Sequence, residues 1–122
     1  MTDELGKMVV ALNHDDADSV MASLVMAASI ATSGDQVMFF VQPGGAKMLA
    51  KNELEKYQGL KGQPDPIHLY ESIRTLEGRF ILCELGLEIC GIKQEDLREG
   101  VEVMMASSFM FEIEGAKLSF SY

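Results

Sequence analysis

The stretch KMVVALNHDDADSVMASLVMAASIATSGDQVMFFV, residues 7–41, decides the fold of this chain. Its apolar run Lys7–Leu12 ends in the cap and turn residues NHDDADS, which is typical of a buried strand that leads into a helix. Ala17–Thr32 then carries apolar and small residues at most positions, with Gly34 as a stop. Gln36–Val41 is a second continuous apolar run. We therefore predict a strand, a helix covered on more than one side, and a second strand.

The alternation continues in the middle of the chain. The turn residues QPGG follow the second strand, and residues 46–57 have a helical composition with one charged face. Residues 59–66 contain two prolines, which argue against regular structure and indicate a loop. Residues 67–76 resume a helical spacing and end at Gly78. We predict one helix on each side of this loop.

The last third of the chain repeats the pattern with shorter elements. Arg79–Cys83 is a third apolar strand, and an acidic link over residues 93–100 leads to a fourth strand at 101–105. Residues 106–116 suggest a helix, and 117–122, KLSFSY, alternate like an edge strand.

Strands that are apolar on both faces and alternate with helices indicate a parallel sheet covered on two sides. We predict one α/β domain over residues 1–122, a three-layer α/β/α fold with a mostly parallel sheet of about five strands. Chemistry in such folds lies beyond the carboxyl ends of the strands. Three of these ends carry candidate residues: Asn13, His14 and Asp15 after the first, the QPGG turn after the second, and Cys83 with Glu84 after the third.

The chain is acidic. Ten Lys plus Arg against nineteen Asp plus Glu give a formal net charge of −9, so neither nucleic acid nor a membrane surface is expected as a partner. The N-terminal MTDELGK lacks the basic start and apolar run of a signal peptide, which predicts a cytoplasmic protein. No GxGxxG or Walker pattern occurs, and no cofactor is predicted.

Both cysteines lie in FILCELGLEICG, residues 80–91, at the junction of the third strand with a following helix. On one regular helix, Cys83 and Cys90 would stand about 10 Å apart along the axis, beyond the limit of about 7 Å between the α-carbons of a disulfide. A zinc site needs about four ligands, usually paired at tight spacing, and the sequence has no CxxC and two histidines. Neither a disulfide nor a metal site is expected.

The residues leave two interpretations of Cys83 open. Cysteine is often an inert core residue, and we expect that role for Cys90 among Leu87, Ile89 and Ile92. Cys83, at the end of a central strand, would face the positive end of a helix, a setting that stabilises a thiolate. The adjacent Glu84 opposes this unless it points to solvent. His14 either belongs to a helix cap or supports a thiolate as an accessory group, if the two strand ends adjoin.

The segment CELGLEICGI, residues 83–92, with the acidic link and EGVEVMMASSFMFEIEGA after it, resembles the DsrE/DsrF/TusD-type sulfur-relay family, in particular its peroxiredoxin-like DsrE branch. That branch has a Cys, a mostly apolar stretch and then Gly-Ile, followed by a Gly-Val strand and a helix. The opening strand, acidic turn, small-residue helix and second strand are also similar. At residue 90 the branch often has an apolar residue such as Met, so no family function is transferred to Cys90.

This resemblance implies a DsrE-like α/β subunit that assembles into trimers, hexamers or related hetero-oligomers. The family cysteine, which corresponds to Cys83 here, accepts sulfur as a persulfide or thiosulfonate and passes it to a carrier such as a TusA-like protein. We therefore expect a sulfurtransferase-like sulfur carrier. The alternatives are a non-catalytic subunit or ligand-binding module of the same fold, and a thiol redox sensor in which Cys90 resolves an oxidised Cys83.

Overall fold

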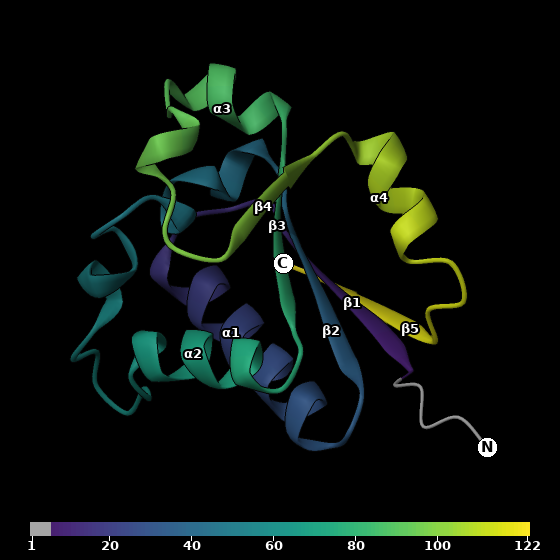
Figure 1. Cartoon of the computed structure of the whole chain (residues 1–122). Coiled ribbons are helices and arrows are strands. Elements are labelled where there is room, and N and C mark those ends of the chain that lie inside the picture. The colour runs from purple at the N-terminus through teal and green to yellow at the C-terminus, as the bar shows by residue number, and fades with distance from the viewer. Residues whose placement is uncertain (1–5) are drawn as a thin grey trace.

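The structure is a computed structural model that describes residues 6–122. Residues 1–5, which make up most of the N-terminal segment in which no signal peptide was predicted, lie outside the described residues. The described chain forms one five-stranded sheet with helices on both faces (Figure 1). Its strands are β1 (Lys7–Leu12), β2 (Gln36–Val41), β3 (Arg79–Cys83), β4 (Val101–Met104) and β5 (Leu118–Ser121).

The strands lie in the order β4-β3-β2-β1-β5, and every neighbouring pair is parallel. This confirms the predicted fold class and the edge position of the last strand. Because parallel strands all run the same way, their carboxyl ends lie at one edge of the sheet. The third strand, which ends in Cys83, is internal, with β2 on one side and β4 on the other.

One face of the sheet, called here the α1 face, is covered by α1 (Ala17–Thr32) and α2 (Pro66–Thr75). The backbone N–H of Ser19 donates to the Asp16 side chain and caps α1, and Asp65 caps α2, which has proline at its first position. Larger side chains then fill the core. The Phe80 ring lies 4.3 Å from the Tyr70 ring and 4.8 Å from that of Phe39, centroid to centroid.

The opposite face, called here the α4 face, is covered by one short helix, α4 (Ala106–Glu112) (Figure 1). Phe109 is the buried residue of that helix, and its ring stacks on Phe40 at 4.2 Å. The buried side chains on this face come from strands β1 to β3 and from α4: Val9, Met38, Phe40, Ile81, Cys83 and Phe109. The two faces thus differ greatly in how much helix covers them.

The single helix predicted over residues 46–57 is wrong. The structure has two 3-10 helices there, η1 (Pro43–Leu49) and η2 (Leu54–Tyr57). The first begins inside the predicted turn, because the Gly44 N–H donates to the Asn13 side chain at 3.0 Å and holds η1 against the end of β1. Between the two, Asn52 has a positive φ of 68°, a left-handed conformation that interrupts helical structure.

The segment after β3 is also irregular. It contains α3 (Leu85–Cys90), which ends at Gly91 with a left-handed backbone, and η3 (Gln94–Asp96). Gly86 lets α3 lie close to its neighbours, since a Cβ there would stand 3.1 Å from both Ala46 Cβ and Leu82 Cδ1. None of the helices described over residues 6–122 is long and apolar enough to span a bilayer.

Candidate functional site

Cys83 is the last residue of β3, opposite Met104 of β4. Its side chain is on the α4 face and is 5% exposed. Beside it opens a pocket of about 290 Å³ lined by Cys83, Glu84, Leu85, Met105, Ala106 and Ser107. The walls therefore come from the start of α3 and from the β4–α4 junction. The thiol lies at the edge where parallel-sheet proteins bind ligands.

The surroundings of Cys83 differ from the sequence expectation in two respects. The helix that follows it has six residues, so its dipole gives a thiolate less support than a long helix would. Of the apolar residues next to Cys83 in the sequence, Leu85 is 63% exposed and gives the thiol little cover, whereas Ile81 and Leu82 are fully buried. What shields the thiol is the β4–α4 segment, whose path the sequence pattern did not reveal.

Cys90 belongs to the other side of the molecule. It is half-buried against the core of the α1 face, and its Sγ lies 3.3 Å from the Pro43 carbonyl oxygen, to which the thiol donates. The expected neighbours Leu87 and Ile92 also pack there, but Ile89 is 66% exposed rather than turned to the sheet. Both cysteines are free thiols, and Cys83 lies on the opposite face.

His14 follows β1 and is exposed. It is absent from the residues that line the pocket beside Cys83 within the described chain. The accessory role predicted for His14 required adjoining strand ends, and β2 lies between β1 and β3. The structure therefore does not bring these two candidate residues together, and the proposal below does not use His14.

A second hollow on the α4 face was missed by sequence reasoning. It lies between α4 and strands β1, β2 and β5, has a volume of about 460 Å³, and includes Gln42, Ser119 and Ser121 in its lining. The alternation in KLSFSY is the signal that could have located it, because Ser119 and Ser121 fall on one face of β5 and Phe120 on the other. The sequence does not say, however, that α4 leaves this part of the sheet open.

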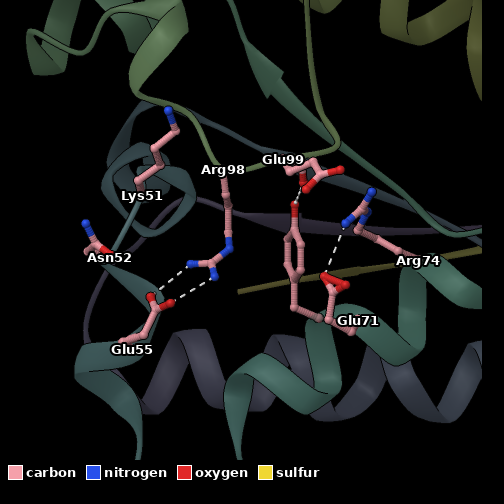
Figure 2. Close-up of a pocket in the computed structure, with 8 residues that line it drawn as sticks. Lys51, Asn52, Glu55, Glu71, Arg74, Arg98 and Glu99 are labelled. Carbon is pink, nitrogen blue, oxygen red and sulfur yellow. Dashed lines mark hydrogen bonds and ion pairs between the residues drawn. The ribbon is translucent and has the colours of Figure 1, made fainter.

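A third pocket, of about 280 Å³, lies between α2, the η1–η2 link and the segment before β4 (Figure 2). Figure 2 shows the Arg98 guanidinium directed at Glu55, with two N–H···O contacts of 3.0 Å each. The Tyr70 hydroxyl donates to the Glu99 carbonyl oxygen, and burial raises the pKa of Tyr70 to about 12. Arg74 pairs with Glu71.

The ion pairs Arg98–Glu55 and Arg74–Glu71 cross or flank the third pocket, so we assign it a structural role: it joins three segments of the chain. Ion pairs also hold α4. Arg79 binds Glu102 of β4 through two nitrogens and contacts Glu112, in the last turn of α4, at 2.6 Å. The hydrogen bonds from Arg79 hold the pKa of Glu102 below its usual range.

Within residues 6–122, no cluster of three or more His, Cys, Asp or Glu side chains is placed to hold a metal ion.

Comparison of the fold with solved structures finds, among others, two proteins of similar length. The ychN protein from E. coli superposes with a TM-score of 0.75 and 16% identity, over 97% of this chain and 99% of that one. MTH1491 from Methanobacterium thermoautotrophicum, a protein of unknown function, superposes with a TM-score of 0.70 and 17% identity, over 96% and 99% of the two chains. No family model matches the sequence, and no curated protein sequence does.

These neighbours define the class to which the fold belongs. The chain has a five-stranded, all-parallel DsrE-like α/β fold, with helices on both faces of the sheet. At 16% and 17% identity the likeness concerns the fold. Activity has to be argued from the residues at the carboxyl edge of the sheet.

Proposed function

We propose that this protein is a sulfur carrier in which Cys83 accepts a sulfane sulfur and passes it on. One observation carries the proposal: a free thiol stands at the carboxyl end of an internal parallel strand and faces a pocket of about 290 Å³. The DsrE-like fold supports a sulfur-relay role as a possibility for this site. The resemblance around residues 83–92 gives the same cysteine as the acceptor.

The chemistry needs no cofactor. A thiol exchanges with a persulfide when its sulfur attacks the outer, sulfane sulfur: one S–S bond forms and one breaks. In balanced form, Cys83–SH and R–S–SH give Cys83–S–SH and R–SH, and the thiol proton of Cys83 ends on the leaving thiol. Passing the sulfur to an acceptor thiol is the same step with the roles exchanged. No external oxidant or reductant is consumed.

Burial of Cys83 suits the storage half of this cycle. A persulfide exposed to solvent reacts with other thiols, so a carrier gains from a shielded site. Cys83 is 5% exposed, with Met105 and Ala106 beside it from the β4–α4 segment. Transfer of the sulfur to an acceptor protein then requires that segment to move aside. We propose that the docking partner, a TusA-like or other sulfur-carrier protein, brings about this opening.

We also propose that the protein acts in the cytoplasm as a homo-oligomer, a trimer or hexamer, or with a related subunit. The support is a set of large apolar side chains left more than half exposed around α3, α4 and β5: Leu85, Ile89, Met105, Met110, Phe111 and Leu118. Exposed apolar groups in such number are typical of interaction surfaces. Light scattering that shows a monomer at all working concentrations would contradict this part of the proposal.

A ligand-binding module without sulfur transfer is the second candidate. The burial of Cys83 favours it, because an inert core cysteine would be equally shielded. A redox pair of Cys83 with Cys90 gains no such support, since the two thiols lie on opposite faces of the sheet.

Intact mass spectrometry of the loaded protein distinguishes these functions. The reduced protein is incubated with an organic persulfide, thiosulfate, tetrathionate, or sulfide plus oxidant, and its mass is read before and after dithiothreitol. We expect a removable adduct of sulfur or thiosulfate that Cys83→Ala abolishes and Cys90→Ala retains. If none of these donors adds mass to the protein and Cys83 is alkylated no faster than free cysteine, the carrier proposal is wrong and the ligand-binding module is the function that remains. An adduct that needs both cysteines would indicate the redox pair.

A further inference from the structure

The 460 Å³ hollow between α4 and the sheet, called here the α4 groove, has the size and character of a small-molecule site. Its floor is apolar, with Val9 of β1 and Phe40 of β2, and Phe109 and Met110 of α4 form one wall. Sites for small ligands typically occupy about 300–1,000 Å³ and combine apolar walls with a few polar groups. The full lining is Val9, Ala11, Phe40, Gln42, Ala106, Ser107, Phe109, Met110, Ile113, Ser119 and Ser121.

The α4 groove contains no charged side chain, although the chain is 24% charged overall. Its polar groups are the Gln42 amide and the hydroxyls of three serines, at 107, 119 and 121. In the described part of the chain these four side chains make no hydrogen bond to protein, so they are free to contact a ligand. An occupant that matches this lining has an uncharged, largely apolar body.

The α4 groove adjoins the pocket of Cys83. Ala106 and Ser107 line both hollows, so the first residues of α4 form part of the wall of each. Cys83 belongs to the same buried cluster as Phe40 and Phe109, which line the groove. An apolar molecule lying in the groove is therefore placed to direct one end to the thiol.

The charges near Cys83 weigh against an inorganic anion as donor. Glu84 is the one charged residue among those that line its pocket in the described chain, and it is negative, on a protein of net charge −9. Thiosulfate and tetrathionate are dianions that would meet repulsion and no compensating cation. The negative charge of Glu84 also disfavours the anion of a persulfide and so favours its protonated form, the form that accepts a thiol at its outer sulfur.

We infer that the α4 groove binds the apolar body of a small organic persulfide and presents its sulfane sulfur to Cys83. This inference rests on the proposed function and specifies the substrate class. The reaction is the exchange written above: the bond between Cys83 Sγ and the outer sulfur forms, the S–S bond of R–S–SH breaks, and R–SH leaves with the proton. The groove holds R while the pocket holds the transferred sulfur.

Three donors that differ in the body R or in charge test the inference. Benzyl persulfide, glutathione persulfide and thiosulfate are each mixed with the reduced protein in a Cys90→Ala background, and the rate of sulfur addition to Cys83 is read by intact mass. Each rate is divided by the rate with free cysteine, which removes intrinsic reactivity. We expect benzyl persulfide to exceed glutathione persulfide by about tenfold or more, and thiosulfate to be slowest.

A groove-filling variant with a matched control supplies the second arm. Ser119→Phe places a ring in the α4 groove, whereas Ser108→Phe adds the same ring at an exposed position of α4 outside the residues that line the groove. We expect Ser119→Phe to remove the preference for benzyl persulfide while its rate with glutathione persulfide is kept, and Ser108→Phe to leave both rates unchanged.

The outcomes distinguish failure of this inference from failure of the proposed carrier function on which it rests. If Cys83 takes up sulfur from all donors at equal normalised rates, or if Ser119→Phe has no effect, the inference fails and the carrier stands. If no donor loads Cys83, the carrier proposal fails and the inference with it. A change in oligomeric state in Ser119→Phe, seen by light scattering, would show that a second copy covers the groove and would overturn the inference.

Discussion

The two faces of the sheet differ in how completely they are covered. On the α1 face, α1 and α2 lie across the sheet and the side chains of Phe39, Phe80 and Tyr70 interlock beneath them with no exposure above 1%. On the α4 face a seven-residue helix supplies one buried residue, Phe109, and two hollows remain beside it. Cys83 is on the less covered face.

The difference indicates a division of labour. A close-packed face stabilises the fold, because apolar area removed from water is the dominant favourable contribution to folding. Local opening of a thinly covered face costs less free energy, and sites that must open to function lie in such regions of low local stability. On this view the α1 face maintains the fold and the α4 face admits the substrate. Each prediction below tests that assignment.

Phe80→Ala should have the largest effect. Its ring is fully buried on the α1 face between those of Phe39 and Tyr70, so truncation should lower the free energy of unfolding by about 3–5 kcal/mol. Urea denaturation followed by circular dichroism measures the loss. A cost under about 1 kcal/mol would mean that the α1 face does not dominate stability, and the comparison would fail.

Gly44→Ala should come next. A Cβ at Gly44 would clash with the carbonyl oxygen of Asn13, which is backbone and cannot turn aside, so we expect a loss of about 1–3 kcal/mol. Gly86→Ala is the milder control, since its Cβ would meet the side-chain atoms Ala46 Cβ and Leu82 Cδ1 at 3.1 Å. Thermal unfolding of both variants should rank Gly44→Ala as the less stable. The reverse order would mean that η1 is not held tightly at the end of β1.

Phe109→Ala should act on reactivity more than on stability. It removes the buried residue of α4, so we expect a loss of about 0.5–3 kcal/mol in unfolding free energy. Alkylation of Cys83, measured in a Cys90→Ala background, should accelerate about tenfold for each 1.4 kcal/mol of lost local protection. Phe80→Ala serves as the comparison under native conditions. A larger acceleration in Phe80→Ala, in proportion to its larger loss of unfolding free energy, would show that Cys83 is exposed by global unfolding rather than by opening of α4.

Glu55→Gln should have the smallest effect, and one that depends on pH. The hydrogen bonds from Arg98 hold the pKa of Glu55 below its usual range. A carboxyl with a depressed folded pKa contributes stability above its unfolded pKa, and this contribution is lost as the pH falls through the folded value. At neutral pH the variant should lose about 0.2–1 kcal/mol, and below the folded pKa of Glu55 it should match the parent. A difference that persists in acid would contradict the ion pair as its cause.

Much of the fold could be predicted because its strands are apolar runs bounded by turn residues. The bounds of β1, α1, β2 and β3 agree with the prediction to the residue. The region of residues 46–57 could not be predicted, because its composition suits a helix while its path is set by the contact of Gly44 with Asn13, far away in the sequence. The intrinsic helix propensity of a segment is overridden where a tertiary contact fixes its backbone.

The candidate site was predictable in position but not in surroundings. Alternation of strands and helices places Cys83 at the carboxyl edge of the sheet. An apolar pattern indicates that a side chain is buried, but it does not indicate which element of the fold buries it. Thus the apolar residues Leu85 and Ile89 are exposed, although Ile89 was expected in the core, and the β4–α4 segment lies beside Cys83 instead.

The place of β5 beside β1 bears on how the protein is made. Met8 pairs with Leu118, so the first and last described strands are neighbours, although synthesis makes β1 well before β5. Until β5 is available, β1 presents unpaired backbone groups along one side, the kind of edge that recruits strands from other chains. Parallel pairings between distant segments also form slowly. The nascent chain thus depends on β5 to pair with the open edge of β1.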